Sequence, residues 1–197
     1  MILETIQSVS FLSRRHILVA KRCPASDSPI LLDVFDFLAA RPEGSTKPPL
    51  VRRFQFPLLA AQVSVHRLTT RSDPEEASSN APASNSLPFC TTPNSRLLTV
   101  KMGFSSGGLG SEHNCVLFVH NCTLLEGLEA CPIQGQVVVP WEDWGPGKTR
   151  MMLTKPDDLK FVNNSHGTRY VELRQSVGRS RLIMMNFNAL ALRRGKC

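Results

Sequence analysis

The sequence predicts an all-β fold: an array of short antiparallel strands interrupted by one long disordered loop. Eleven apolar runs, most of them four to nine residues long, are bounded by turn-forming residues such as Gly, Pro, Asn, Asp and Ser. Several runs alternate between apolar and polar residues, and almost no long helical period is present. The runs are 9–12, 17–20, 30–38, 50–56, 61–68, 96–102, 115–120, 136–139, 150–153, 168–173 and 182–187.

Before the loop, the run 30–38 allows two interpretations. Leu31, Val34, Phe35 and Leu38 share one face of a helix, whereas a strand places Leu31, Phe35 and Phe37 on one face with Asp33 among them. We predict a strand that runs into a short helix.

After the loop, the type of apolar pattern distinguishes two kinds of strand. Polar and apolar residues alternate in 168–173, as they do earlier in 53–56, and this alternation predicts half-buried strands. The continuous apolar runs 115–119 and 137–139 predict strands that are buried on both faces.

Residues 71–95 differ from the rest of the chain in composition. Eighteen of these 25 residues are Ser, Pro, Asn, Thr or Ala, and no apolar period is visible. Such a segment is typical of a flexible loop or linker. Because long structureless connections are unusual inside a compact domain, we interpret it as either an insertion or a boundary.

The strand spacing further predicts a partial β-propeller. A blade takes about 40–45 residues in four strands, so residues 1–70 and 96–197 together supply roughly three to four blades. Closed propellers typically have about 4–8 blades. We therefore interpret both segments as blade-like strands of one domain, as expected for a fragment of a larger protein, with strand edges exposed.

The charge distribution disfavours a nucleic-acid-binding protein. The formal net charge is +7, which by itself suggests an anionic partner. However, the basic residues are scattered, and no basic tract is longer than two adjacent residues. Phosphate-binding surfaces usually show clustering on one face or tail.

The chain has the sequence features of an intracellular protein, cytoplasmic or nuclear, with no membrane association. Glu4 and Gln7 interrupt the N-terminus, so a secretory signal is not expected. No apolar run approaches the roughly 20 residues needed to cross a bilayer. The six cysteines form no CxxC pairs and are expected to be free thiols.

The most distinctive motif begins where an apolar run ends. Pro140 is expected to end that strand, because it lacks a backbone donor. Trp141 and Trp144 are expected to cover a sheet edge, with their indole N–H groups reaching backbone carbonyls. Gly145 and Pro146 then predict a turn.

Further motif residues follow at intervals: Arg150, then His166, Gly167 and Arg169, and finally the run 182–188. Together with the Pro–Trp motif, this series resembles the C-terminal region of basidiomycete F-box-domain proteins. The bodies of those proteins look like degenerate WD-type propellers. Residues 10–19, 32–36 and 54–58 resemble their blade strands more loosely.

The resemblance implies a non-catalytic protein-interaction module similar to the substrate-recognition body of an F-box protein of a ubiquitin ligase. The partner protein is not implied. The family's F-box, a helical segment near the N-terminus, has no counterpart in this sequence. Docking to a Skp adaptor is therefore expected only if such a segment lies upstream.

Motifs for chemistry are incomplete, so we expect no enzyme activity, no cofactor and no metal. The segment 145–149 resembles the end of a phosphate-binding loop, but Glu142 replaces the required glycine and Pro146 removes an amide. Cys115, Cys122 and Cys131, considered together with His113 and His120, lack the close ligand pairs of structural zinc. Two alternatives to the interaction module remain: a basic scaffolding or nucleic-acid-associated β-domain, and a truncated, non-functional fragment.

Overall fold

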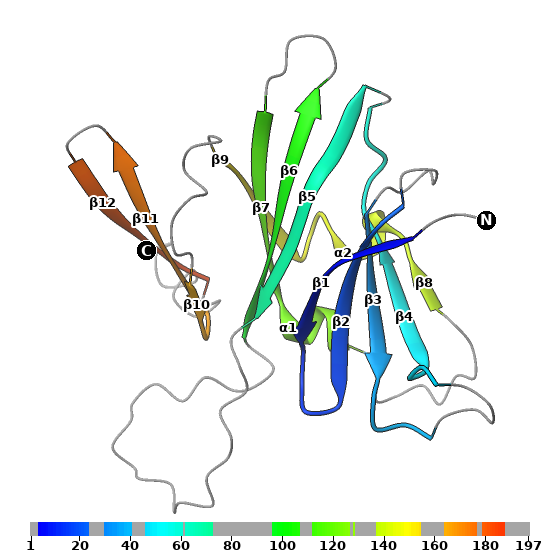
Figure 1. Cartoon of the computed structure of the whole chain (residues 1–197). Coiled ribbons are helices and arrows are strands. Elements are labelled where there is room, and N and C mark those ends of the chain that lie inside the picture. Colours follow the sequence, from blue (N-terminus) through cyan, green and yellow to red (C-terminus); the bar gives the residue numbers. More distant parts are fainter. Residues whose placement is uncertain are drawn as a thin grey trace, which may run out of the picture.

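In the computed structural model, twelve strands and two short helices are described (Figure 1). The description covers residues 4–23, 30–40, 46–60, 62–72, 96–106, 112–126, 128, 137–154, 164–176 and 179–187. These residues form three open sheets of five, four and three strands, which we call sheets A, B and C. The prediction of a mostly β protein is confirmed. The described strands do not close into a propeller.

Sheet A has the strand order β1-β2-β3-β4-β8. The first four strands are an antiparallel meander, whereas β8 pairs with β4 in parallel, so the expectation of a purely antiparallel array is wrong here. The bounds are β1 Thr5–Phe11, β2 His16–Arg22, β3 Ile30–Asp36, β4 Leu50–Gln55 and β8 Val137–Val139.

Sheet B has the order β5-β6-β7-β9 and sheet C the order β10-β11-β12, both antiparallel throughout. Helix α1 (Asn121–Leu125) follows β7, and helix α2 (Trp141–Trp144) follows β8. The strand bounds are β5 Val63–Ser72, β6 Leu97–Ser106, β7 Glu112–His120, β9 Thr149–Thr154, β10 Asn164–His166, β11 Arg169–Ser176 and β12 Arg179–Asn186.

Sheet B lies between the other two sheets, and each of its faces contributes to one core (Figure 1). Leu98 and Leu117 pack with Leu32 and Phe54 of sheet A. The opposite face packs against sheet C through a smaller set of side chains that includes Phe118. Because successive strand residues point to opposite faces, β6 and β7 supply both cores from neighbouring positions.

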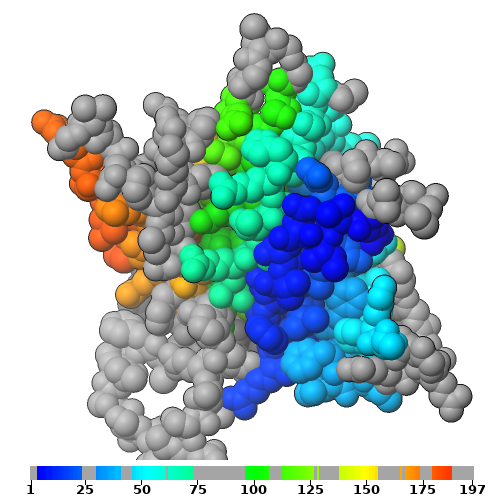
Figure 2. All heavy atoms as spheres, in the orientation of Figure 1, coloured from blue at the N-terminus to red at the C-terminus, as the bar shows by residue number. Residues whose placement is uncertain are grey.

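The first strands of sheets A and B are joined by side-chain hydrogen bonds, and β1 lies against β5 in Figure 2. Ser10 Oγ is 2.8 Å from Thr70 Oγ1, and the Thr70 amide donates to Ser8 Oγ over 3.0 Å. Arg22 Nη1 donates to the Val65 carbonyl over 2.7 Å. Polar groups at two sheet edges thus satisfy one another across the junction.

A buried ion cluster crosses the middle of sheet A. The carboxylate of Asp33 is fully buried, with Lys21 Nζ 2.7 Å from Oδ2 and Arg53 Nε 2.7 Å from Oδ1. Glu4 lies 2.8 Å from the same lysine and 3.3 Å from Arg53 Nη2. Burial alone would raise the pKa of Asp33, but the hydrogen bonds from Arg53 and Lys21 outweigh it and leave the pKa below its ordinary value.

The eleven predicted runs all lie on strands, but several details of the prediction are wrong. The strand 30–36 forms, yet the described residues 37–40 after it are not helical, because the Asp36 carboxylate accepts hydrogen bonds from the amides of Leu38 and Ala39 and holds a bend. The run 115–119 is buried on both faces, whereas Val138 is 46% exposed because it lies beside Arg53 on the outer face of sheet A.

Residues 71 and 72, which the sequence pattern assigns to the predicted loop, belong to β5 instead. Residues 73–95 lie outside the described residues. The strands on either side of the segment, β5 and β6, pair with each other in sheet B. The segments 1–70 and 96–197 therefore share a sheet.

Replacing Asp33 with Asn should destabilise the fold by about 3 kcal/mol, because Lys21 and Arg53 lose a buried counter-charge. The measurement is urea unfolding at pH 7. As a control, Glu126→Gln removes an exposed ion pair with Lys148 and should leave the midpoint unchanged.

The Asp33 carboxylate should also determine how the stability of the fold falls with pH. The pKa of Asp33 is lowered in the folded state, so between that value and the unfolded value of about 3.9 the unfolded chain binds more protons. Stability contributed by Asp33 is therefore present above pH 4 and is lost as the pH falls through the folded pKa. Asp33→Asn should flatten this part of the stability curve, and an unchanged acid limb would contradict the assignment.

Candidate functional site

The Pro–Trp motif folds as a corner between sheets A and B. Strand β8 ends at Val139, Pro140 is the N-cap residue of α2, and the helix holds Trp141 and Trp144. Trp144 is buried, and its Nε1 donates to the carbonyl of Gln55 at the end of β4 over 2.9 Å. The prediction that an indole N–H reaches a backbone carbonyl is confirmed for this residue.

Four aromatic rings surround this corner. The Trp144 ring is 5.3 Å from Phe54, 5.4 Å from Phe56 and 5.0 Å from Trp141. Trp141 stacks on Phe56 at 5.6 Å with an interplanar angle of 28°. Rings at these separations add edge-to-face attraction to the burial of their large apolar area. The cluster therefore fastens α2 to the end of β4.

The turn predicted at Gly145 and Pro146 forms directly after α2. The Gly145 carbonyl accepts hydrogen bonds from Thr149 N at 3.0 Å and Thr149 Oγ1 at 2.6 Å. Strand β9 begins directly at Thr149, where a phosphate-binding loop would continue into a helix. Arg150 is exposed, and its Nη1 donates to the Thr149 carbonyl over 2.8 Å.

His166, Gly167 and Arg169 belong to a different part of the molecule. His166 ends β10 and pairs in register with Arg169 of β11 across a two-residue turn. Gly167 has a φ of 57°, a left-handed conformation that suits glycine in a tight hairpin. Its carbonyl accepts from the Leu97 amide at 2.8 Å, which ties sheet C to β6. The motif residues thus act at two separate junctions and do not converge on one site.

The cysteines considered for a metal site are not brought together. Cys115 is buried within the core between sheets A and B, and burial raises its pKa to about 11. Cys122 is exposed on α1, and Cys131 lies outside the described residues. Among the described side chains, no group of three His, Cys, Asp or Glu could hold a metal ion.

Three cations share the face of sheet B that is turned toward sheet C. Lys101 of β6 pairs in register with Thr69, and Arg67 and Arg71 are two positions to either side on β5. Burial, followed by the charges of Arg71 and Arg67, lowers the pKa of Lys101 to about 8, while Glu172 opposes the shift. The sequence analysis missed this group, because the three residues lie on two strands separated by residues 73–95.

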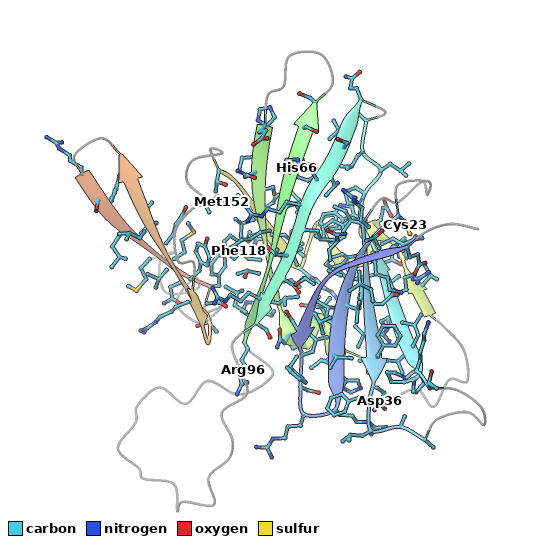
Figure 3. All side chains as sticks on the ribbon, viewed as in Figure 1. Cys23, Asp36, His66, Arg96, Phe118 and Met152 are labelled. Atoms are coloured by element: carbon cyan, nitrogen blue, oxygen red, sulfur yellow. The ribbon has the colours of Figure 1, made fainter. Side chains whose placement is uncertain are left out.

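Apolar side chains remain exposed on the outer face of sheet C. Val171 pairs with Met184 and Leu173 pairs with Leu182 across β11 and β12. Leu182 is 67% exposed and Met184 is 64% exposed. The alternate positions along β12 face the core instead. There Met185 packs near Phe118 and Tyr170, and Phe118 is labelled in Figure 3. We call Val171, Leu173, Leu182 and Met184 the sheet C patch.

A second exposed apolar row lies on the outer face of sheet A. Val9 and Phe11 of β1 are both more than half exposed, and Phe11 contacts Phe37 edge to face at 6.4 Å. On the same face, Phe11 is in register with Ile17, which is in register with Phe35. The two outer sheets therefore both present apolar side chains to solvent.

Comparison with protein-family models, curated proteins and solved structures gave no match. In the described part of the chain, neither helix is long and apolar enough to cross a membrane.

Gly145→Ala should destabilise the protein by about 1–3 kcal/mol, because a Cβ at this position would overlap the indole ring of Trp141. The control is Gly147→Ala in the same turn, where an added Cβ meets nothing within 4 Å. Thermal unfolding of both variants checks the prediction. Equal melting temperatures would show that the Trp141 ring yields at no cost.

The lysine ammonium of Lys101 should titrate near pH 8 when followed by ¹³C-detected NMR of labelled lysines. Arg71→Gln should raise this midpoint toward the ordinary value of 10.5, because one of the neighbouring positive charges is removed. Arg150→Gln, on the far strand of the same sheet, should leave it unchanged. A Lys101 midpoint insensitive to Arg71 would contradict the arrangement.

Proposed function

We propose that the chain is a non-catalytic protein-interaction module similar to the substrate-recognition body of an F-box protein of a ubiquitin ligase. The observation that carries the proposal is the sheet C patch. Its two cross-strand pairs form one apolar area, and two of its four side chains are about two-thirds exposed. Contiguous apolar surface of this kind is typical of protein contact sites.

The arrangement of the sheets supports the same proposal. Sheet B is a four-stranded antiparallel sheet, like a propeller blade, and it stacks face to face between sheets A and C. The first strands of sheets A and B lie next to each other, as the inner strands of neighbouring blades would. After β7 of sheet B the chain returns to sheet A and adds β8 beside β4. In a propeller the strands of one blade follow one another in sequence, so this step differs from a propeller. We interpret the stack as a partial, propeller-like body.

The link to a ubiquitin ligase rests on the sequence resemblance and needs an F-box elsewhere in the full-length protein. The two described helices have five and four residues and offer no such segment. We propose an intracellular location, cytoplasmic or nuclear, in keeping with ligase substrates. A Skp adaptor is the expected partner of a full-length form, and the sheet C patch is proposed to face the substrate.

Leu182→Asp/Met184→Asp should abolish partner binding and leave the fold intact, because both side chains are largely solvent-exposed. The tagged chain and its variants are cross-linked in a basidiomycete lysate, and recovered proteins are quantified by mass spectrometry. Specific partners should fall at least fivefold in the double variant. The control, Leu153→Asp, changes a 77% exposed residue on β9 of sheet B and should retain them.

Two outcomes would overturn the proposal. Either no protein is enriched over the untagged control, or the enriched proteins are unaffected by the double variant. Circular dichroism melts of all variants separate a lost surface from a lost fold.

A basic scaffolding or nucleic-acid-associated function is the second candidate, favoured by the three cations Arg67, Arg71 and Lys101 on neighbouring strands. Oligonucleotide binding, measured in parallel at 50 and 200 mM salt, decides between the nucleic-acid-associated function and the protein-interaction module. Binding that weakens steeply with salt and is lost in Arg67→Gln/Arg71→Gln would replace the protein-interaction proposal.

A further inference from the structure

Strand β12 is a free edge of sheet C within the described part of the chain. The strand order β10-β11-β12 ends there, and all eight residues of β12 pair with β11 on one side. Along residues 179–185, the backbone N–H and C=O groups on the outer side of this edge face a position that no described strand occupies. Such an edge is a template for the addition of an extended segment from another chain.

The side chains of β12 divide between two faces. Leu182 and Met184 point outward and belong to the sheet C patch, while Ile183 and Met185 point toward sheet B. A strand added beside β12 would continue the same rows. Every second residue of the added strand would therefore extend the patch and would need an apolar side chain.

Charge identifies the other residues of the added strand. Arg179 and Arg181 are exposed and occupy the positions of β12 that alternate with the patch residues. Glu172 is the one described acidic residue of sheet C, and it is fully buried on the inner face. A second copy of this chain would bring the same arginines to the edge without an exposed carboxylate to match them. An acidic partner supplies that counter-charge.

We propose that β12 binds an extended, acidic segment of a partner protein by strand addition, with apolar residues against the sheet C patch and Asp or Glu near Arg179 and Arg181. The inference rests on the proposed function and specifies its partner class. The expected recognition pattern is an alternation of apolar and acidic residues, with the acidic residues placed beside Arg179 and Arg181. Opposite charges on neighbouring strands favour the complex, while a basic segment would be repelled.

Side-chain recognition is tested with labelled eight-residue peptides and the whole chain, by fluorescence anisotropy at 50 mM salt. A peptide alternating Leu and Asp should bind at least tenfold more tightly than one alternating Leu and Lys. It should also bind more tightly than a peptide of the same composition with Leu and Asp in separate blocks. Equal binding of all three would overturn the proposal.

Charge reversal provides the matched protein variants. Arg179→Glu/Arg181→Glu should weaken the Leu-Asp peptide at least tenfold and should strengthen the Leu-Lys peptide. Arg150→Glu changes an exposed arginine on sheet B and should leave both affinities unchanged. If Arg150→Glu has the same effect as the double variant, the peptide responds to overall charge and the proposal fails.

Backbone pairing is tested separately by N-methylation of the Leu-Asp peptide. In an extended strand, successive N–H groups point to opposite edges. Methylation of the set facing β12 should abolish binding, while methylation of the other set should be tolerated. Two methylated peptides of equal affinity would exclude strand addition.

The result is distinguishable from failure of the proposed function. If the Leu-Asp peptide does not bind but Leu182→Asp/Met184→Asp still removes cross-linked partners, the partner class is wrong and the interaction surface remains. Concentration-dependent dimerisation of the chain in sedimentation, abolished by that double variant, would assign the edge to a second copy instead.

Discussion

The structure depends on the burial of sheet B from both sides. Strands β6 and β7 place alternate side chains in two cores, so each strand needs a partner layer on each face. Leu98 and Leu117 are covered by sheet A, and Leu97 and Phe118 are covered by sheet C. Exposing either face would return several large apolar side chains to water, each worth about 1.5–3 kcal/mol. The junctions between sheets therefore matter as much as the sheets themselves.

Each junction between two sheets is held by its own set of contacts. Sheets A and B are joined at one end by Ser8, Ser10 and Thr70, and at the other by α2, whose Trp144 is bonded to β4 before the chain enters β9 of sheet B. Sheet C is held by the Gly167 carbonyl and by rings packed around Phe118. The motif residues make these structural contacts. Because the contacts belong to two junctions, the motif residues are spread over two places in the fold.

The sequence predicted strands well because the signals for strands are local. Short apolar runs ended by turn residues identify all but β10, which has three residues and contains no apolar one. The same local signals failed where a distant partner decides the outcome. The pattern predicts that Val138 is buried, but its pairing with Arg53 places it on the outer face of sheet A, where Val9 and Phe11 are also exposed. Asp33 stood out in an apolar run, yet its cationic partners come from β2 and β4.

The candidate surface was beyond sequence reasoning for a related reason. Residues 182–185 are all apolar, and nothing in them distinguishes Met184, which faces solvent, from Met185, which faces sheet B. That distinction is fixed by the register of β12 on β11 and by the layer beneath them. In a closed ring of sheets every such face would have a neighbour. An open stack necessarily has two outer faces, and here both carry apolar side chains. The exposed rows on sheets A and C are thus a direct consequence of an open stack built from strands with two apolar faces, and we propose that a binding partner covers them.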